Sequence, residues 1–245
     1  MLNSLKINLQ IYLQYFCYKA ILLSLLFTTS AYSQDLQPED GYKLITQSLV
    51  KAKKHMVVAA HPAAVSAGAE ILKANGTAVD AAIATQLVLN LVEPQSSGIG
   101  GGAFLIYLDG KTKELISYDG RETAPAEVTE SLFLTSNGEP MGFYEAAIGG
   151  RSVGVPGTLA LLEHVHKAHG RLPWDQLFQP AITLAINGFP ASDRLIESLK
   201  GKRKKRIQQY KASSDYFFPL GKTLKTGDIM NNVIFAETLS KISNH

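Results

Sequence analysis

The residues with the clearest chemical potential lie between positions 93 and 126. A glycine cluster, Gly98–Gly102, precedes an apolar segment, and a second apolar segment leads into Asp119-Gly120-Arg121-Glu122. A guanidinium presents a planar fork of donors that matches a carboxylate through two charge-assisted hydrogen bonds. Arg121 could therefore bind a small carboxylate. The alternative is an ion pair with Asp119 or Glu122, which contributes little at a surface and which these residues alone favour.

The glycine cluster does not have the surroundings of a phosphate-binding loop. Such a loop follows a strand and opens a helix, whose amino terminus holds the anion. Here a predicted helix precedes Gly98–Gly102 and a predicted strand follows it. Two interpretations stay open: a tightly packed corner between helix and strand, or a corner whose backbone also borders an active-site cleft.

The elements that would position these residues can be read from hydrophobic periodicity and turn signals. The apolar run Met56–Ala60 predicts a buried strand, and Asp109-Gly110 predicts a hairpin turn between strands at Ala103–Leu108 and Glu114–Tyr118. The last predicted helix has an apolar face without a following element, so we expect the fold to be unfinished at the chain end. Helices are predicted at Ala63–Asn75, Val79–Val92, Thr158–His169, Pro173–Asn187, Ser192–Leu199 and Val233–Ile242.

The first 33 residues differ in kind from the rest. They carry only two charged side chains, both lysines, and an apolar run at 20–27. Ala31-Tyr32-Ser33 supplies small residues at the two positions that a signal peptidase recognises. This pattern predicts a secretory signal peptide over residues 1–33, followed by one domain over 34–245. The alternative is a membrane anchor, but a spanning helix needs about 20 apolar residues. We therefore expect a secreted or periplasmic protein without a stable membrane span.

Charge and cysteine usage narrow the class of protein further. The 245 residues carry a formal net charge of +3, and residues 34–245 carry 22 basic and 21 acidic side chains. This near-neutral balance predicts no nucleic-acid partner, and we interpret the basic run Lys200–Arg206 as a solvated loop or helix face. The single cysteine, Cys17, lies in the signal segment. The remaining chain has no disulfide, thiol nucleophile or thiolate metal ligand.

Other candidate chemistry within the chain is weak. His164, His166 and His169 lie on one predicted helix, where only His166 and His169 share a face. No matching carboxylate pair accompanies them, so we expect no metal site. The sequence around Ser66 and Ser97 does not resemble that of the nucleophile in a Ser-His-Asp catalytic triad.

Several motifs, taken together and in this order, resemble those of γ-glutamyltranspeptidases. The resemblance runs from about Met56 to the end of the chain and concerns the amino-terminal part of the precursor, which becomes the large subunit. The motifs are Val79-Asp80-Ala81-Ala82, Glu93-Pro94, Gly98-Ile99-Gly100-Gly101-Gly102, Asp119-Gly120-Arg121-Glu122-Thr123-Ala124-Pro125-Ala126, Gly154-Val155-Pro156-Gly157, Pro173-Trp174, Gln179-Pro180-Ala181-Ile182 and Asn187-Gly188-Phe189.

The resemblance implies an α/β fold, the αββα sandwich of N-terminal-nucleophile hydrolases, of which this chain would hold only the incomplete amino-terminal part. It implies cleavage of γ-glutamyl amide bonds, as in glutathione, through a γ-glutamyl-enzyme. The nucleophile would be a threonine at the start of a small subunit cut from the same precursor. It also implies that Arg121 binds the α-carboxylate of the substrate, and we expect no cofactor.

The same resemblance places the nucleophile and the oxyanion donors beyond this chain. We therefore predict no catalytic residue within it and a heterodimer with the small subunit. The alternative hypothesis is a truncated, catalytically inert chain or a binding-only remnant that lacks the threonine nucleophile.

Overall fold

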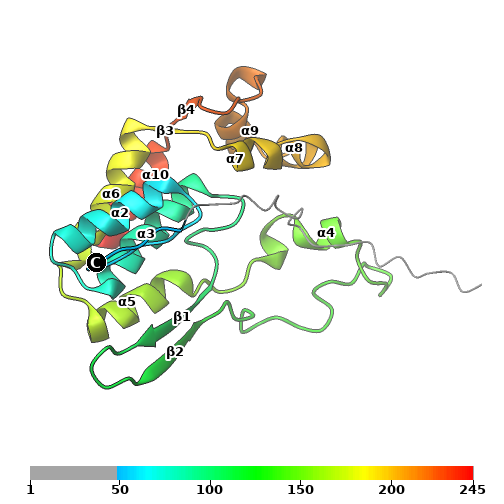
Figure 1. Ribbon diagram of the computed structural model, residues 1–245. Coiled ribbons are helices and arrows are strands. Elements are labelled where there is room, and N and C mark those ends of the chain that lie inside the picture. Colours follow the sequence, from blue (N-terminus) through cyan, green and yellow to red (C-terminus); the bar gives the residue numbers. More distant parts are fainter. Residues whose placement is uncertain (1–48, 245) are drawn as a thin grey trace, which may run out of the picture. The chain divides into compact units, whose positions relative to one another are not determined.

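Helices are the main regular structure of the described chain, and one antiparallel hairpin forms its main sheet (Figure 1). The structure, a computed structural model, describes residues 49–244. Residues 52–244 belong to one unit of the fold. The elements are α2 (Pro62–Lys73), α3 (Ala78–Val92), β1 (Ala103–Leu108), β2 (Leu115–Gly120), α4 (Phe143–Ala147), η1 (Gly150–Ser152), α5 (Thr158–His169), α6 (Trp174–Asn187), β3 (Phe189–Pro190), α7 (Asp193–Ser198), α8 (Gly201–Ile207), α9 (Lys211–Phe217), η2 (Pro219–Gly221), β4 (Ile229–Met230) and α10 (Val233–Ser243).

Helix α3 forms the centre of the core, as its apolar sequence predicts. Eleven of its 15 residues are buried, and α2, α5 and α6 pack around it. A capping box begins the helix: the Thr77 side chain accepts from the Asp80 backbone N–H, and the Asp80 carboxylate accepts from the Thr77 N–H. Asp80 is fully buried and also accepts from the backbone N–H groups of Arg171 and Leu172. This carboxylate therefore joins the start of α3 to the segment between α5 and α6.

The β1–β2 hairpin has one covered face and one open face. Its register pairs Ala103 with Gly120 and Leu108 with Leu115. The covered face lies toward α5, which contacts β2. Because side chains alternate along a strand, the open face collects the exposed apolar residues. These are Phe104, Ile106, Leu108 and Leu115.

The strand predicted at Met56–Ala60 does not form. The segment is irregular, with Val57 and Ala59 half-buried and Met56, Val58 and Ala60 exposed. Val57 lies close to Gly68 of α2, and Ala59 packs against the core. No strand within residues 49–244 pairs with this segment, so Val57 and Ala59 pack against α2 and the core without completing a sheet, while Met56 and Val58 are exposed.

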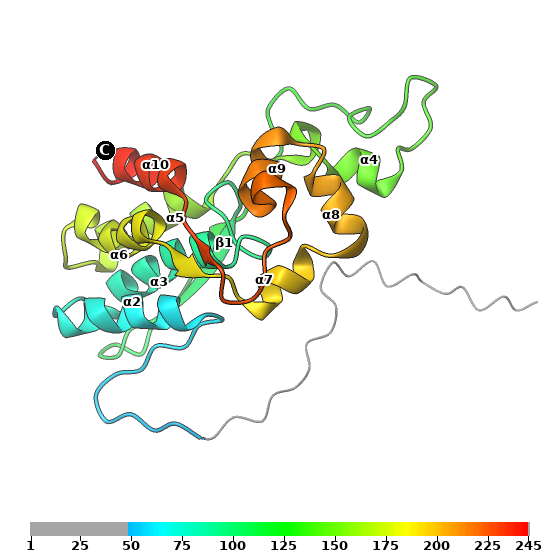
Figure 2. The same cartoon turned by 90° about the horizontal axis from the view of Figure 1, so that it is seen from above.

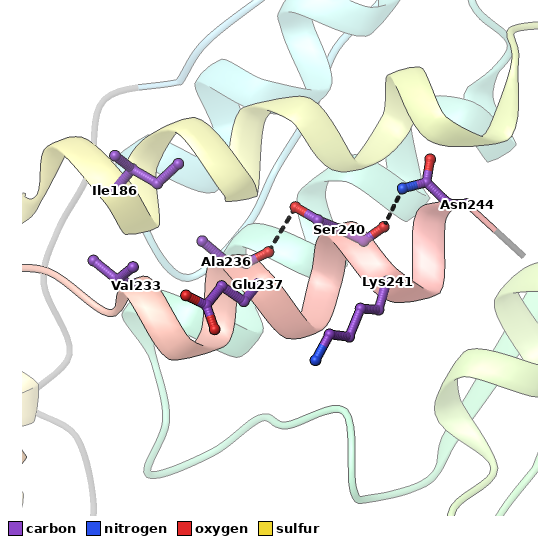
Figure 3. A pocket seen from close by; sticks show the side chains of 7 residues that line it. All are labelled: Ile186, Val233, Ala236, Glu237, Ser240, Lys241 and Asn244. Carbon is purple, nitrogen blue, oxygen red and sulfur yellow. Dashed lines mark hydrogen bonds between the residues drawn. The ribbon is translucent and has the colours of Figure 1, made fainter.

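The last helix packs against an element that precedes it in the sequence. Helix α10 lies along α6 and buries Leu239. Val233 and Ile234, at the start of that helix, are exposed. A groove of about 340 Å³ lies between the two helices. Figure 3 shows its lining residues, among them Ile186 on α6 and Ser240 on α10. The basic run predicted as a loop or helix face is helical and forms α8.

The predicted signal peptide, residues 1–33, lies outside the described residues. Within residues 49–244, none of the helices has the length and apolar character needed to cross a bilayer.

Candidate functional site

The hairpin register brings the two predicted functional segments to the same end of the sheet. Gly98–Gly102 enters β1 at Ala103, and Arg121 leaves β2 immediately after Gly120. Ala103 and Gly120 are paired across the hairpin. Segments 20 residues apart in sequence therefore become neighbours through one antiparallel pairing.

Glycines allow three backbone segments to meet around Gly120. A Cβ atom at Gly102 would lie 2.7 Å from the Glu122 backbone nitrogen, and a Cβ at Gly157 would overlap the Gly120 carbonyl. The Gly101 carbonyl accepts hydrogen bonds of 3.0 Å from the backbone N–H groups of Gly157 and Thr158. Gly102 therefore belongs to a tightly packed corner, whereas a Cβ at Gly98 or Gly100 would meet no atom within 4 Å. Both sequence interpretations include such a corner.

The Gly154–Gly157 motif supplies the third segment of this corner. The Val155 N–H donates to the Thr123 carbonyl at 2.8 Å, and the two residues form an isolated antiparallel bridge. Thr123 follows the Arg121-Glu122 pair directly. The chain that carries Arg121 is thus held between the glycine cluster on one side and the entry to α5 on the other.

Arg121 itself projects from this corner into solvent. Its side chain is 70% exposed, and its Nε lies 3.4 Å from Glu122 Oε2, whose side chain is 32% exposed. The Asp119 carboxylate accepts from the Arg121 backbone N–H at 2.8 Å. Among the described residues, the Nη1 and Nη2 groups make no ion pair or hydrogen bond. The predicted ion pair with Glu122 exists, and it leaves the outer edge of the guanidinium open to an anion.

The Glu122 side chain also packs against the glycine-bearing segments, a contact that sequence reasoning did not predict. Its carboxylate lies over the glycine cluster, within 3.5 Å of the position a Cβ would take at Gly101, and its Cβ approaches Gly154 in the same way. Because both glycines lack side chains, the Glu122 side chain can lie flat against the corner and fix one edge of the guanidinium. The only signal in the sequence was its position next to Arg121.

A buried ion pair ties the start of the corner to α7. Glu93, which is buried, accepts from Arg194 Nη1 at 2.9 Å and from Gln95 Nε2 at 2.6 Å. Arg194 Nη2 also donates to Ser96 Oγ at 2.7 Å. Glu93 and Arg194 are 101 residues apart, and no sequence pattern indicated that they would meet.

A short polar network holds the next residues of the corner. Gln86 Nε2 donates to Asn90 Oδ1 and to Ser97 Oγ, each at 2.8 Å, and Ser97 Oγ donates to Asn90 Oδ1 at 2.5 Å. Ser97 therefore has a structural role directly before Gly98. This agrees with the absence of a triad context in the sequence.

Burial and a neighbouring charge shift the pKa of the nearby His61 in opposite directions. Burial lowers the pKa of His61, while the negative charge of Glu93 raises it, and the net shift is downward from 6.5. The Nδ1 of His61 accepts from the Ala63 backbone N–H at 3.1 Å and so caps α2. Acceptance at Nδ1 requires that this nitrogen carry no proton.

The three histidines of α5 are held by packing contacts. His166 and His169, three positions apart on α5, have different partners: His169 stacks on Tyr107 with ring centroids 4.0 Å apart, whereas His166 bonds the Leu172 carbonyl at 2.9 Å. His169 Nε2 also lies 2.6 Å from the Tyr118 hydroxyl. Within residues 49–244, no group of three or more His, Cys, Asp or Glu side chains could hold a metal ion.

This arrangement of hairpin, helices and glycine-lined corner matches solved N-terminal-nucleophile hydrolases. The crystal structure of Helicobacter pylori gamma-glutamyltranspeptidase aligns with a TM-score of 0.75 and 33% identity, covering 80% of this chain and 56% of that one. The described residues form part of this α/β fold.

The sequence comparisons agree on the family. The Gamma-glutamyltranspeptidase family matches residues 64–245. The glutathione hydrolase proenzyme of Bacillus subtilis is 40% identical over 228 residues, which are 92% of this chain and 38% of that protein. Glutathione hydrolase 3 of Arabidopsis thaliana is 36% identical over 236 residues, 91% of this chain and 36% of that protein. The chain belongs to the γ-glutamyltranspeptidase family and spans less than two fifths of these relatives' length, in their large-subunit region.

Proposed function

We propose that this chain is the large-subunit part of a γ-glutamyltransferase or glutathione hydrolase, and that Arg121 binds the α-carboxylate of the γ-glutamyl substrate. The observation that supports this role is the open guanidinium edge of Arg121, fixed at the corner where three glycine-bearing segments meet. A carboxylate could accept two charge-assisted hydrogen bonds from that edge.

The reaction requires a nucleophile from a second segment of the precursor. The hydroxyl of an amino-terminal threonine attacks the γ-amide carbonyl, and the threonine α-amine takes the proton. The amide C–N bond then breaks, the leaving amine takes up that proton, and a γ-glutamyl ester remains on the enzyme. Water or an acceptor amine attacks the ester, which yields glutamate or a new γ-glutamyl amide and restores the threonine. The role of this chain is to hold the substrate while these steps occur.

The open face of the hairpin supports a small-subunit partner. Four apolar side chains occupy one face of a two-stranded sheet, which is an unusual surface to leave in water. We propose that a sheet of the small subunit covers this face, giving the stacked-sheet sandwich of the family. The glutathione hydrolase proenzymes among the relatives are consistent with such a processed partner.

We further propose that the protein is exported to the periplasm or beyond by cleavage of residues 1–33. The composition of that segment and the absence of cysteine after Cys17 support this location. Sequencing the amino terminus of the exported protein would test it directly, because cleavage near Ser33 predicts a mature chain that starts near Gln34.

Arg121→Lys tests the proposed substrate role. The chain is produced with the small subunit of its own precursor, and hydrolysis of γ-glutamyl-p-nitroanilide is followed. We expect the KM to rise about tenfold or more, because a lysine cannot reproduce a two-pronged bond to a carboxylate. The matched control is Arg151→Lys, an exposed arginine that donates to the Leu132 carbonyl. An unchanged KM in Arg121→Lys would remove Arg121 from the site, and no hydrolysis by the parent pair would reject the proposed activity.

A further inference from the structure

Helix α8 carries a concentration of positive charge that the proposed reaction does not use. All five residues from Lys202 to Arg206 are cationic, and α8 contains no acidic residue. Cationic side chains three or four positions apart on a helix repel one another, as Lys202 does with Lys205 and with Arg206. Such a helix is stabilised when an anionic surface approaches it.

Lys204 and Arg206 are among the cations that contacts within the fold hold. Lys204 donates to Thr223 Oγ1 at 3.0 Å and lies over the Phe218 ring. The Arg206 guanidinium lies 3.2 Å from the centroid of the Tyr144 ring of α4. Lys202 and Lys205 remain exposed and form no ion pair with any other residue between positions 49 and 244.

The turn that Lys204 contacts presents an unusual leucine. Leu220 lies in η2, is 94% exposed, and has a φ of 54° and a ψ of 30°. This left-handed conformation is disfavoured for a residue with a Cβ, and leucine gains nothing from it locally. Lys222 follows two positions later and is also exposed. Packing inside the described chain does not account for an apolar side chain at this place.

The contacts of Lys204 place the leucine beside the cationic helix. Because Lys204 bonds to Thr223 and covers Phe218, the turn 219–222 lies next to α8. Figures 1 and 2 both show α8 beside α9, which leads into this turn. Lys202 and Lys205 lie three positions apart and share one side of α8. With Leu220 and Lys222 of the adjoining turn, we call these exposed residues the α8–η2 surface.

We propose that the α8–η2 surface docks on an anionic lipid bilayer. Lysines attract acidic headgroups, and a leucine at the tip of a turn can enter the boundary between headgroups and acyl chains. Nucleic acid fits this surface less well, because binding of unpaired bases uses exposed aromatic or arginine planes and an exposed leucine offers phosphates nothing. This inference does not depend on the proposed catalytic function.

Vesicle sedimentation with the full chain tests the proposal. Vesicles of phosphatidylcholine alone are compared with vesicles containing three parts in ten phosphatidylglycerol, at low and high salt. We expect salt-sensitive binding that requires phosphatidylglycerol. Replacing both Lys202 and Lys205 by glutamine should weaken it about thirtyfold, since each lysine near an acidic surface contributes about a factor of five. Residues 1–33 carry Lys6 and Lys19 beside an apolar run and would themselves favour phosphatidylglycerol. They are identical in the parent and in every variant, so the difference between parent and variant is compared.

Matched variants separate this surface from general charge and hydrophobicity. Lys53→Gln with Lys54→Gln removes the same charge from another exposed segment and should leave binding unchanged. Leu220→Asn keeps a residue that tolerates the left-handed backbone while removing the apolar side chain, and it should lower binding at both salt concentrations. Leu220→Trp places an indole at the turn, whose emission should shift to shorter wavelength when phosphatidylglycerol vesicles are added, above the background of Trp174. Circular dichroism checks that each variant folds as the parent does.

Several results would overturn the proposal. If the Lys53/Lys54 variant lost as much binding, the attraction to the vesicles would be explained by the net charge of the chain and not by the α8–η2 surface. An unshifted emission from Leu220→Trp in the presence of bound vesicles would mean that the turn stays in water. Displacement of the chain from vesicles by single-stranded DNA, together with no effect of Leu220→Asn, would assign the surface to nucleic acid instead.

Discussion

Arg121 depends on residues that never touch it, because its position is set by how closely other backbones approach Gly120. Gly157 has a φ of −115° and a ψ of −17°, which any residue can adopt. Its glycine is therefore required by space: a Cβ would overlap the Gly120 carbonyl and lie 3.2 Å from the Arg121 carbonyl. The Gly154–Gly157 motif is best explained by contact with the Arg121 segment.

Gly157→Ala should therefore destabilise the chain and displace Arg121. Forcing a methyl group into this contact costs about 1–3 kcal/mol, the usual range for overpacking. Urea unfolding measures the loss. Gly110→Ala is the matched control, because a Cβ at Gly110 would meet no atom within 4 Å. If the two variants were equally stable, the backbone around Gly120 would accommodate the added methyl group without loss of stability. The position of Arg121 would then not depend on this close contact.

At the scale of the element, α2 has an amino-terminal cap that titrates. The cap needs an unprotonated Nδ1 on His61, and burial lowers the pKa of this histidine below 6.5 in the folded chain. In the unfolded chain the pKa returns to about 6.5. Below about pH 6.5 the unfolded chain therefore binds more protons at His61 than the folded chain does. The stabilisation that comes from a neutral His61 is complete above pH 6.5, and it is lost as the pH falls from 6.5 through the pKa of the folded chain.

His61→Asn should remove this pH dependence while keeping a cap, because asparagine is a strong capping residue and does not titrate in this range. We expect the urea midpoint of the parent to fall more between pH 7.5 and pH 5.5 than the midpoint of the variant. His55→Asn, at an exposed histidine outside the helix, is the control and should follow the parent. Parallel curves for parent and His61→Asn would contradict the assignment.

Elements with strong local signals were predictable, and contacts between distant elements were not. The apolar run of α3 and the Asp109-Gly110 turn specify their structures locally. Met56–Ala60 shows the limit: five apolar residues fit a strand, but a strand needs a neighbour to pair with. The pairing of Glu93 with Arg194 depends on how α7 packs, and periodicity carries no information about that. The prediction for Arg121 came from a family resemblance, because its local sequence alone favoured a surface ion pair.

At the scale of the whole molecule, the described chain has a core on one side of its hairpin and water on the other. The helices around α3 form a closed apolar cluster. The open hairpin face cannot be completed from within residues 49–244, since the only other sheet there is the two-residue pairing of β3 with β4. A surface of this kind gains free energy when a partner covers it, by about 25 cal/mol for each Å² of apolar area removed from water.

Ile106→Asn separates assembly from folding. Ile106 is 72% exposed, so its loss should change the urea midpoint of the isolated chain little, while it should weaken association with the small subunit markedly because an amide would be buried without a partner. Co-purification of the two subunits and the size of the complex measure the effect. The control is Ile234→Asn, at an isoleucine that is 78% exposed on α10. If the two variants impair assembly equally, the hairpin face has no special part in it; if neither does, the small subunit binds elsewhere and the proposed sandwich is wrong.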